Sequence, residues 1–171
     1  MKQFLFRGVD RKTKEWAFGS LFRIESSPFG IDIIIKECSR MASGKKIGED
    51  SLAFDPDSFS VCIPGTVGQF TGARDKSGNR IFEGDIVRMT YKKATDYIDD
   101  EQVYYESGDF IGVAVLTSRG IQLNPVYVIT DRERKNGCHY SQTSYKTITA
   151  RRSQVIGNVF SNPDWEKKLL K

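Results

Sequence analysis

A glycine-rich stretch from Thr66 to Val87, TVGQFTGARDKSGNRIFEGDIV, constrains the fold of this chain more than any other feature. It contains Gly68, Gly72, Gly78 and Gly84, follows Gly65, and ends in an apolar run. Glycine adopts positive φ angles at little cost, so this spacing predicts tight turns that lead into strands. Neither this stretch nor the rest of the chain supplies an evident nucleophile, metal cage or phosphate-binding loop.

Short runs of β-branched and aromatic residues predict strands along most of the chain. Phe4–Gly8 and Glu15–Phe22 form an expected antiparallel hairpin around the polar turn Asp10–Lys14. Further strands are expected over 30–37, 60–63, 86–91, 110–116, 120–123, 126–130, 145–148 and 154–160. Asn162, Pro163 and Asp164 begin a short C-terminal helix, because asparagine caps a helix and proline suits its first turn. The chain is therefore expected to be mainly β.

Pro64 and the glycines between Ile63 and Gly72 mark the best boundary between two units. We expect a small N-terminal β-rich unit over 1–63 and a second unit over 64–171. Two polar segments, 92–108 and 131–143, predict long loops within the second unit.

Size and composition favour a folded protein of the cytoplasm. With 171 residues, 39% hydrophobic and 28% charged, the chain is long enough to bury a core of its own. No apolar run approaches the roughly 20 residues that span a bilayer, and no signal-peptide core follows Met1. The three cysteines, Cys38, Cys62 and Cys138, fit reduced and mostly buried thiols.

Charge is separated along the chain although the net charge is only +4. The acidic stretch contains Asp96, Asp99, Asp100, Glu101, Glu106 and Asp109. The basic one contains Arg132, Arg134, Lys135, Lys146, Arg151 and Arg152, with Tyr140 and Tyr145 among them. These cations and rings could contact a nucleic acid, or they could form a solvated loop. A third hypothesis is self-association, in which one subunit's acidic segment meets another's basic segment.

Three constellations resemble catalytic or metal sites but fit simpler roles better. Glu83 and Asp85 flank a glycine, where the aspartate is expected to cap local amides. Asp75, Ser77 and Asn79 imitate a calcium loop, but Arg80 stands where glycine is needed and Ile86 where the bidentate glutamate belongs. Cys138 and His139 are adjacent, so their side chains would not face each other on a strand. We therefore expect no catalytic residue, no metal and no cofactor.

Six short motifs carry a resemblance to a known family. They are FRG at Phe6–Gly8, W-x-x-G at Trp16–Gly19, TVGQFTG at Thr66–Gly72, D-K-x-G at Asp75–Gly78, EGDIV at Glu83–Val87 and VIGN at Val155–Asn158. In these residues and this order, the sequence resembles the YopX family of phage and prophage proteins. The resemblance implies an N-terminal β-rich piece followed by a Src-homology-3-type barrel, encoded in a phage or an integrated prophage. It implies no reaction.

The sequence thus predicts a non-enzymatic accessory protein in the cytosol of a bacterial host. We expect it to bind a host or phage macromolecule or to assemble with itself, without contacting a membrane. The alternative is a nucleic-acid-binding protein that uses the basic segment 132–152.

Overall fold

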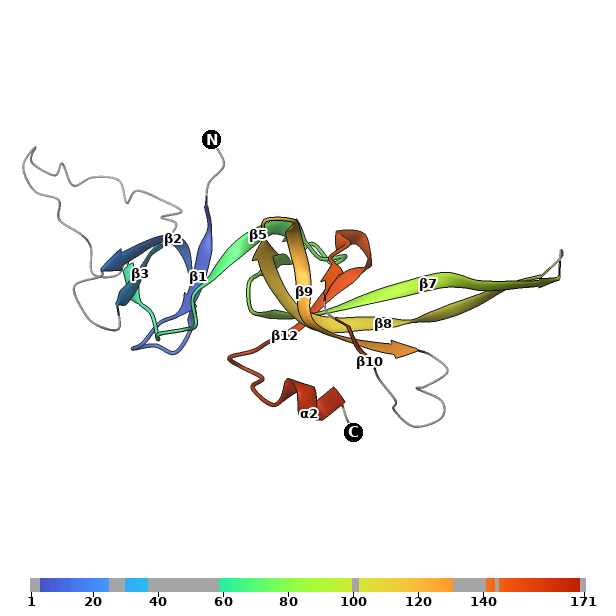
Figure 1. The fold of residues 1–171 in the computed structure, drawn as a ribbon. Coiled ribbons are helices and arrows are strands. Elements are labelled where there is room, and N and C mark those ends of the chain that lie inside the picture. Colours follow the sequence, from blue (N-terminus) through green and yellow to red (C-terminus); the bar gives the residue numbers. More distant parts are fainter. Residues whose placement is uncertain are drawn as a thin grey trace, which may run out of the picture. The chain divides into compact units, whose positions relative to one another are not determined.

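The computed structural model describes residues 4–24, 30–36, 59–99, 102–130, 141–143 and 145–169 (Figure 1). The expectation of a mainly β chain with a short C-terminal helix is confirmed. Its elements are β1 (Phe6–Val9), β2 (Trp16–Ile24), β3 (Ile31–Lys36), β4 (Phe59–Val61), β5 (Gly68–Arg74), β6 (Arg80–Phe82), β7 (Asp85–Asp99), β8 (Gln102–Thr117), β9 (Gly120–Thr130), β10 (Ser141–Thr143), β11 (Lys146–Thr147), the 3-10 helix η2 (Ala150–Arg152), β12 (Ser153–Asn158) and α2 (Trp165–Leu169). Within these ranges, no helix has the length and apolar character that crossing a membrane requires.

The chain divides into two compact units, Met1–Phe70 and Thr71–Lys171. This division lies inside the boundary region expected from the sequence, Ile63 to Gly72, although after residue 64, where the second unit was expected to begin. The turn that follows Ile63 is tied into the first unit, because the hydroxyl of Thr66 donates to the carbonyl of Ile63 (2.7 Å) and accepts from the amide of Val9 (3.0 Å). The division falls instead within β5, which begins in the first unit and ends in the second.

The first unit is an antiparallel sheet in the order β4-β3-β2-β1-β5. The predicted hairpin is confirmed, since β1 pairs with β2 around a turn in which the Asp10 carboxylate accepts from the amides of Lys12 and Thr13, both at 2.8 Å. Ala17, Ile34 and Cys62 form the buried core. Burial raises the pKa of the Cys62 thiol, in keeping with its predicted role as a small buried apolar side chain. Cys38 and Cys138 lie outside the described residues.

Two motif glycines of the first unit permit close approach of neighbouring strands. A Cβ atom on Gly8 would lie 2.6 Å from the Sγ of Cys62. A Cβ atom on Gly19 would overlap the carbonyl oxygen of Ile35 on the paired strand β3. FRG and W-x-x-G therefore serve packing in this unit.

The second unit is built on an antiparallel sheet in the order β10-β9-β8-β7-β12, with β11 also pairing with β9. One apolar cluster contains Ile81, Val87, Ala114, Leu123 and Val126. A second contains Ile86, Ile111, Ile129 and Trp165, so α2 contributes to the core. Ile86 and Val87 are successive residues of β7 and belong to different clusters, because successive side chains of a strand point to opposite faces. The described strands do not close into a barrel, and the Src-homology-3-type barrel is not confirmed.

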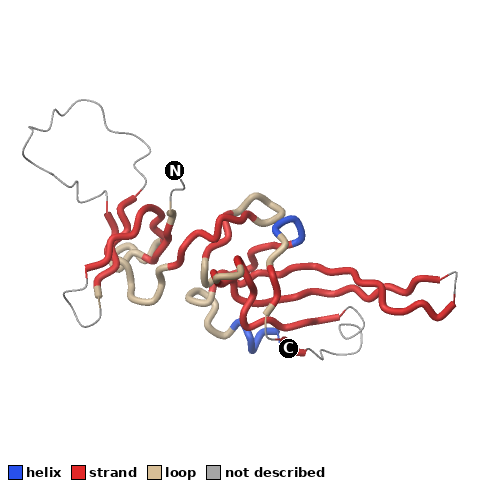
Figure 2. Tube along the Cα trace, turned by 45° about the horizontal axis from the view of Figure 1, so that its top comes forward, coloured by secondary structure: helices blue, strands red, loops and turns tan. Residues whose placement is uncertain are grey.

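The prediction of a loop over 92–108 is wrong. Strand β7 continues to Asp99 and β8 begins at Gln102, and the two pair from Ile86↔Val113 to Asp99↔Gln102. Strand β12 pairs with β7 only up to Met89, and β9 pairs with β8 only from Gly108 onward. Beyond them the two strands continue as a ribbon (Figure 2). No other described strand pairs with this part of β7 and β8. A two-stranded ribbon of this kind needs no apolar alternation, and its sequence is polar and rich in tyrosine and β-branched residues.

The second predicted loop, 131–143, is described only at its end. Residues 131–140, which include the adjacent Cys138 and His139, lie outside the described residues. Ser141–Thr143 is strand β10, which pairs with Val126–Val128 of β9.

Candidate functional site

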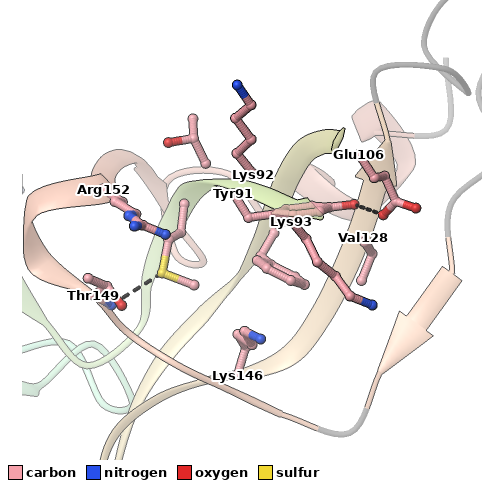
Figure 3. Close-up of a pocket in the computed structure, with 11 residues that line it drawn as sticks. Tyr91, Lys92, Lys93, Glu106, Val128, Lys146, Thr149 and Arg152 are labelled. Atoms are coloured by element: carbon pink, nitrogen blue, oxygen red, sulfur yellow. Dashed lines mark hydrogen bonds between the residues drawn. The ribbon is translucent and has the colours of Figure 1, made fainter. Parts of the chain in front are cut away.

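The second unit has an open groove of about 560 Å³ at the root of the ribbon (Figure 3). Its lining comes from four parts of the chain that are distant in sequence. Strand β7 contributes Met89 to Lys93, β8 contributes Glu106 and Phe110, β9 contributes Val128, and the segment from β11 to η2 contributes Lys146, Thr149 and Arg152. We call this feature the basic groove.

Strand alternation decides which side chains of β7 enter the basic groove. Met89 pairs with Phe110 and Lys93 pairs with Glu106 across to β8. Since residues two apart share a face, Met89, Tyr91 and Lys93 lie on the face of the groove. Lys92 lies on the other face, where its Nζ is 4.2 Å from the ring centroid of Tyr105. Figure 3 shows Lys92 pointing away from Lys93 and Lys146.

Two aromatic rings form the floor of the basic groove. The centroids of Tyr91 and Phe110 are 4.6 Å apart, with their planes inclined by 32°. The Nζ of Lys146 lies 4.5 Å from the centroid of Phe110, so a cation stands over the face of one ring. The hydroxyl of Tyr91 donates to Oε1 of Glu106 at 2.8 Å, which fixes the orientation of the other.

The short helix η2 brings an arginine to the wall of the groove. The amide of Thr149, just before η2, donates to the Sδ of Met89 at 3.2 Å. The hydroxyl of Ser153 donates to the carbonyl of Ala150 (2.9 Å) and holds the end of the turn. Arg152 is thereby placed on the groove, whereas its neighbour Arg151 is not part of the lining, although both arginines are exposed.

The basic residues singled out from the sequence therefore separate into three groups. Lys146 and Arg152 line the groove, and Arg151 does not. Arg132, Arg134 and Lys135 lie outside the described residues. Sequence reasoning missed Lys93 and Tyr91, because both fall in the segment interpreted as a loop. The continued alternation Met89, Tyr91, Lys93 is the signal that could have found them.

Most charged side chains that line the basic groove are cations. Among the described residues that line the groove, Lys93, Lys146 and Arg152 outnumber the one carboxylate, that of Glu106. None of these described residues is a cysteine or a histidine. In the described part of the chain, no group of three or more His, Cys, Asp or Glu side chains is arranged to hold a metal ion. What the groove offers is positive charge beside aromatic ring faces.

Two of the sequence motifs meet at the opposite end of β7. The carbonyl of Gly84 accepts from the amide of Val159 (3.0 Å) and from Nδ2 of Asn158 (2.9 Å). Strand β12 pairs with β7 through Asn158↔Asp85 and Gly157↔Ile86. The motifs EGDIV and VIGN thus pair with each other in the fold, although they are far apart in sequence.

A model of the family described as YopX protein matches residues 5–166 of the chain. The chain belongs to the YopX family. Comparison with curated proteins finds no match.

The YopX motifs are accounted for by structural roles. The carboxylate of Asp85 is buried and accepts from the amide of Phe82 at 2.8 Å, as the turn interpretation predicts. Oε1 of Glu83 accepts from the amide of Leu116 at 3.2 Å. The Asp75 carboxylate likewise organises its own turn, accepting from the amides of Ser77 and Asn79, both at 2.9 Å. The motifs by which the sequence resembles YopX proteins therefore hold the fold together, and the basic groove lies elsewhere.

Proposed function

We propose that this YopX-family chain is a non-enzymatic binding protein whose basic groove holds a single-stranded nucleic acid. The observation that carries the proposal is the placement of Lys93, Lys146 and Arg152 around the Tyr91–Phe110 pair. Proteins that bind single strands combine a cationic track for the phosphates with rings on which bases stack. A duplex keeps the faces of its bases stacked inside, so it would use the cations of the groove but not the rings.

Several predictions from the sequence accompany this proposal. The resemblance to phage and prophage proteins supports a phage or prophage origin, a location in the bacterial cytosol and a Src-homology-3-type arrangement of the second unit. Absence of catalysis stays a prediction from the sequence. Binding of an unidentified host or phage protein stays a prediction.

Fluorescence anisotropy with labelled single strands of about 15 nucleotides, the upper range of common site sizes, tests the proposal. The triple variant Lys93→Ala, Lys146→Ala, Arg152→Ala removes three cations from the basic groove. A matched triple variant, Lys12→Ala, Arg119→Ala, Lys167→Ala, removes the same charge from exposed positions that do not line it. We expect the first variant to lose about 100-fold in affinity and the control to lose less than about 5-fold, because contacts rather than net charge hold the strand.

The rings are tested separately with Tyr91→Leu. Loss of stacking on one base costs about 1–3 kcal/mol, so the affinity should fall by roughly 5- to 150-fold for single strands and little for a duplex. Equal losses in the groove triple variant and the control triple variant would reject the groove as the binding site. A wild-type chain that does not bind single strands at low salt would reject the function.

A further inference from the structure

The sheet of the first unit is apolar on both faces. Its inner face packs Ala17, Ile34 and Cys62 into the core. The alternate positions of β2, β3 and β4 carry large apolar side chains as well, on the outer face. We define the outer face by Phe18, Phe22, Ile31, Ile33, Ile35 and Phe59.

Strand register makes the outer face continuous. Phe22 of β2 pairs with Ile33 of β3, and Ile35 of β3 pairs with Phe59 of β4. These four side chains line an open hollow of about 400 Å³. The outer face is thus a connected surface across three strands.

Much of the outer face is accessible to solvent. Phe22 is 56% exposed, Phe18 is 41% exposed, and Ile31 and Ile35 are each 39% exposed. At about 200 Å² for a fully exposed large side chain, these fractions correspond to roughly 350 Å² of apolar surface, to which half-buried Ile33 and Phe59 add. A contiguous patch of this size on a soluble protein usually marks an interaction site.

The size and chemistry of the outer face fit a second copy of the same chain. A standard interface buries about 800 Å² on each partner, of which about 60% is apolar, so the outer face supplies most of the apolar part. A two-fold interface brings the same surface of each subunit together, so a charged side chain near the axis would meet its own copy. The four residues that line the hollow are uncharged. Arg7 of β1 also lies on this face, since it pairs with Phe18, but β1 lies on the side of β2 away from the hollow, and the guanidinium of Arg7 is 4.5 Å from the centroid of the Trp16 ring.

We propose that the chain forms a homodimer in which the outer faces of the two first units pack together. This contact differs from the association of acidic and basic segments suggested by the sequence, and it does not depend on the basic groove. Apolar burial drives it, so added salt should leave it intact or strengthen it. A contact between charged segments would weaken in salt.

Sedimentation equilibrium of the full chain tests the dimer. We expect a concentration-dependent monomer–dimer equilibrium that persists in about 1 M salt, where charge interactions are screened within about 3 Å. The variant Phe22→Ser, Ile35→Ser should raise the dimer dissociation constant at least about 100-fold, as loss of central apolar contacts does. The control Ile156→Ser, Phe160→Ser removes side chains of similar exposure, 43% and 42%, from the second unit, and should leave the dissociation constant unchanged.

Circular dichroism spectra of each variant establish that it remains folded. If the variant Phe22→Ser, Ile35→Ser unfolds, Phe18→Lys replaces it, because this substitution places a charge on an already exposed position. It should raise the dimer dissociation constant by a similar factor. A wild-type chain that stays monomeric at its highest soluble concentration would overturn the proposal and indicate that the chain's own residues cover the outer face. A dimer dispersed by salt, or one insensitive to both outer-face variants, would also overturn it.

Discussion

Replacing Asp75 should destabilise the second unit through the loss of four hydrogen bonds. Oδ1 of Asp75 accepts from the amides of Ser77 and Asn79, both at 2.9 Å. Its Oδ2 accepts from Nδ2 of Asn79 at 3.2 Å and from the amide of Val155 at 3.1 Å. The carboxylate therefore holds its own turn and also joins this turn to strand β12.

The size of the destabilisation depends on which of the four donors can bind water after the carboxylate is removed. Each hydrogen bond to a charged acceptor contributes about 1.5–3 kcal/mol, and a buried donor left without a partner costs about 1–3 kcal/mol. Ser77 and Asn79 are exposed, so their amides can bind water, whereas the amide of Val155 lies in a paired strand and is partly buried. We expect Asp75→Ala to cost about 3 kcal/mol in the free energy of unfolding. Asp75→Asn keeps one acceptor oxygen and should cost about 2 kcal/mol.

Urea denaturation measures this cost. The two tryptophans are Trp16 and Trp165, so a Trp16→Phe background leaves Trp165 as the reporter of the second unit. Asp164→Ala is the control, since Asp164 is 64% exposed and pairs with Lys167, which is 79% exposed. It should change stability by less than about 0.5 kcal/mol. A cost below about 1 kcal/mol for Asp75→Ala would refute the reasoning.

The same carboxylate should make stability depend on pH. Burial opposes its ionisation, but the hydrogen bonds from Val155, Asn79 and Ser77 outweigh burial and hold the pKa of Asp75 below its ordinary value of 3.8. A lowered folded-state pKa means that the stabilisation is fully present above pH 3.8 and is lost as the pH falls through the folded-state pKa. Asp75→Asn should therefore flatten the acid limb of the stability curve. An unchanged acid limb would contradict this cause.

Three further perturbations test the packing and the groove. Gly19→Ala drives a methyl group into the carbonyl of Ile35, so it should cost about 3 kcal/mol or prevent folding of the first unit. Ser20→Ala should be nearly neutral. Urea denaturation with Trp16, the tryptophan of the first unit, as the reporter measures both. Ile34→Ala empties a fully buried core position and should lower the free energy of unfolding by about 2–5 kcal/mol. Glu106→Gln removes the carboxylate of the basic groove while keeping an acceptor for Tyr91, so anisotropy should show roughly 2- to 5-fold tighter binding of single strands at low salt.

The sequence predicted the elements whose signals are local. The turns at Asp10 and Asp75 follow from aspartate side chains that bond nearby amides, and the hairpin of β1 and β2 follows from alternation on either side of the first turn. The short helix after Asn162 was also predicted, but the side-chain oxygen of Asn162 accepts from the amide of Asn158 at 3.2 Å, and α2 begins at Trp165. The family motifs indicated the family because their residues make contacts that hold the fold together. One such contact is the hydrogen bond that Nδ2 of Asn158 donates to the carbonyl of Gly84.

The ribbon and the basic groove could not be predicted in the same way. Solvent-facing strands of a ribbon lack the apolar alternation that separates a strand from a loop, so residues 92–108 looked like a loop. The groove unites Lys93 with Lys146 and Arg152, and only the pairing of β7, β8, β9 and β11 brings these segments together. The outer face could not be predicted either. Ile33, Ile34 and Ile35 form a continuous apolar run, and such a run does not indicate which face of the strand is buried and which is exposed.

The salt dependence of single-strand affinity tests the central claim most directly. Each phosphate neutralised on a single strand contributes about −0.7 to the slope of the logarithm of the association constant against the logarithm of the salt concentration. If Lys93, Lys146 and Arg152 each hold a phosphate, the slope of the wild-type chain should be more negative than that of the groove triple variant by about 2. Equal slopes for the two proteins would contradict the account.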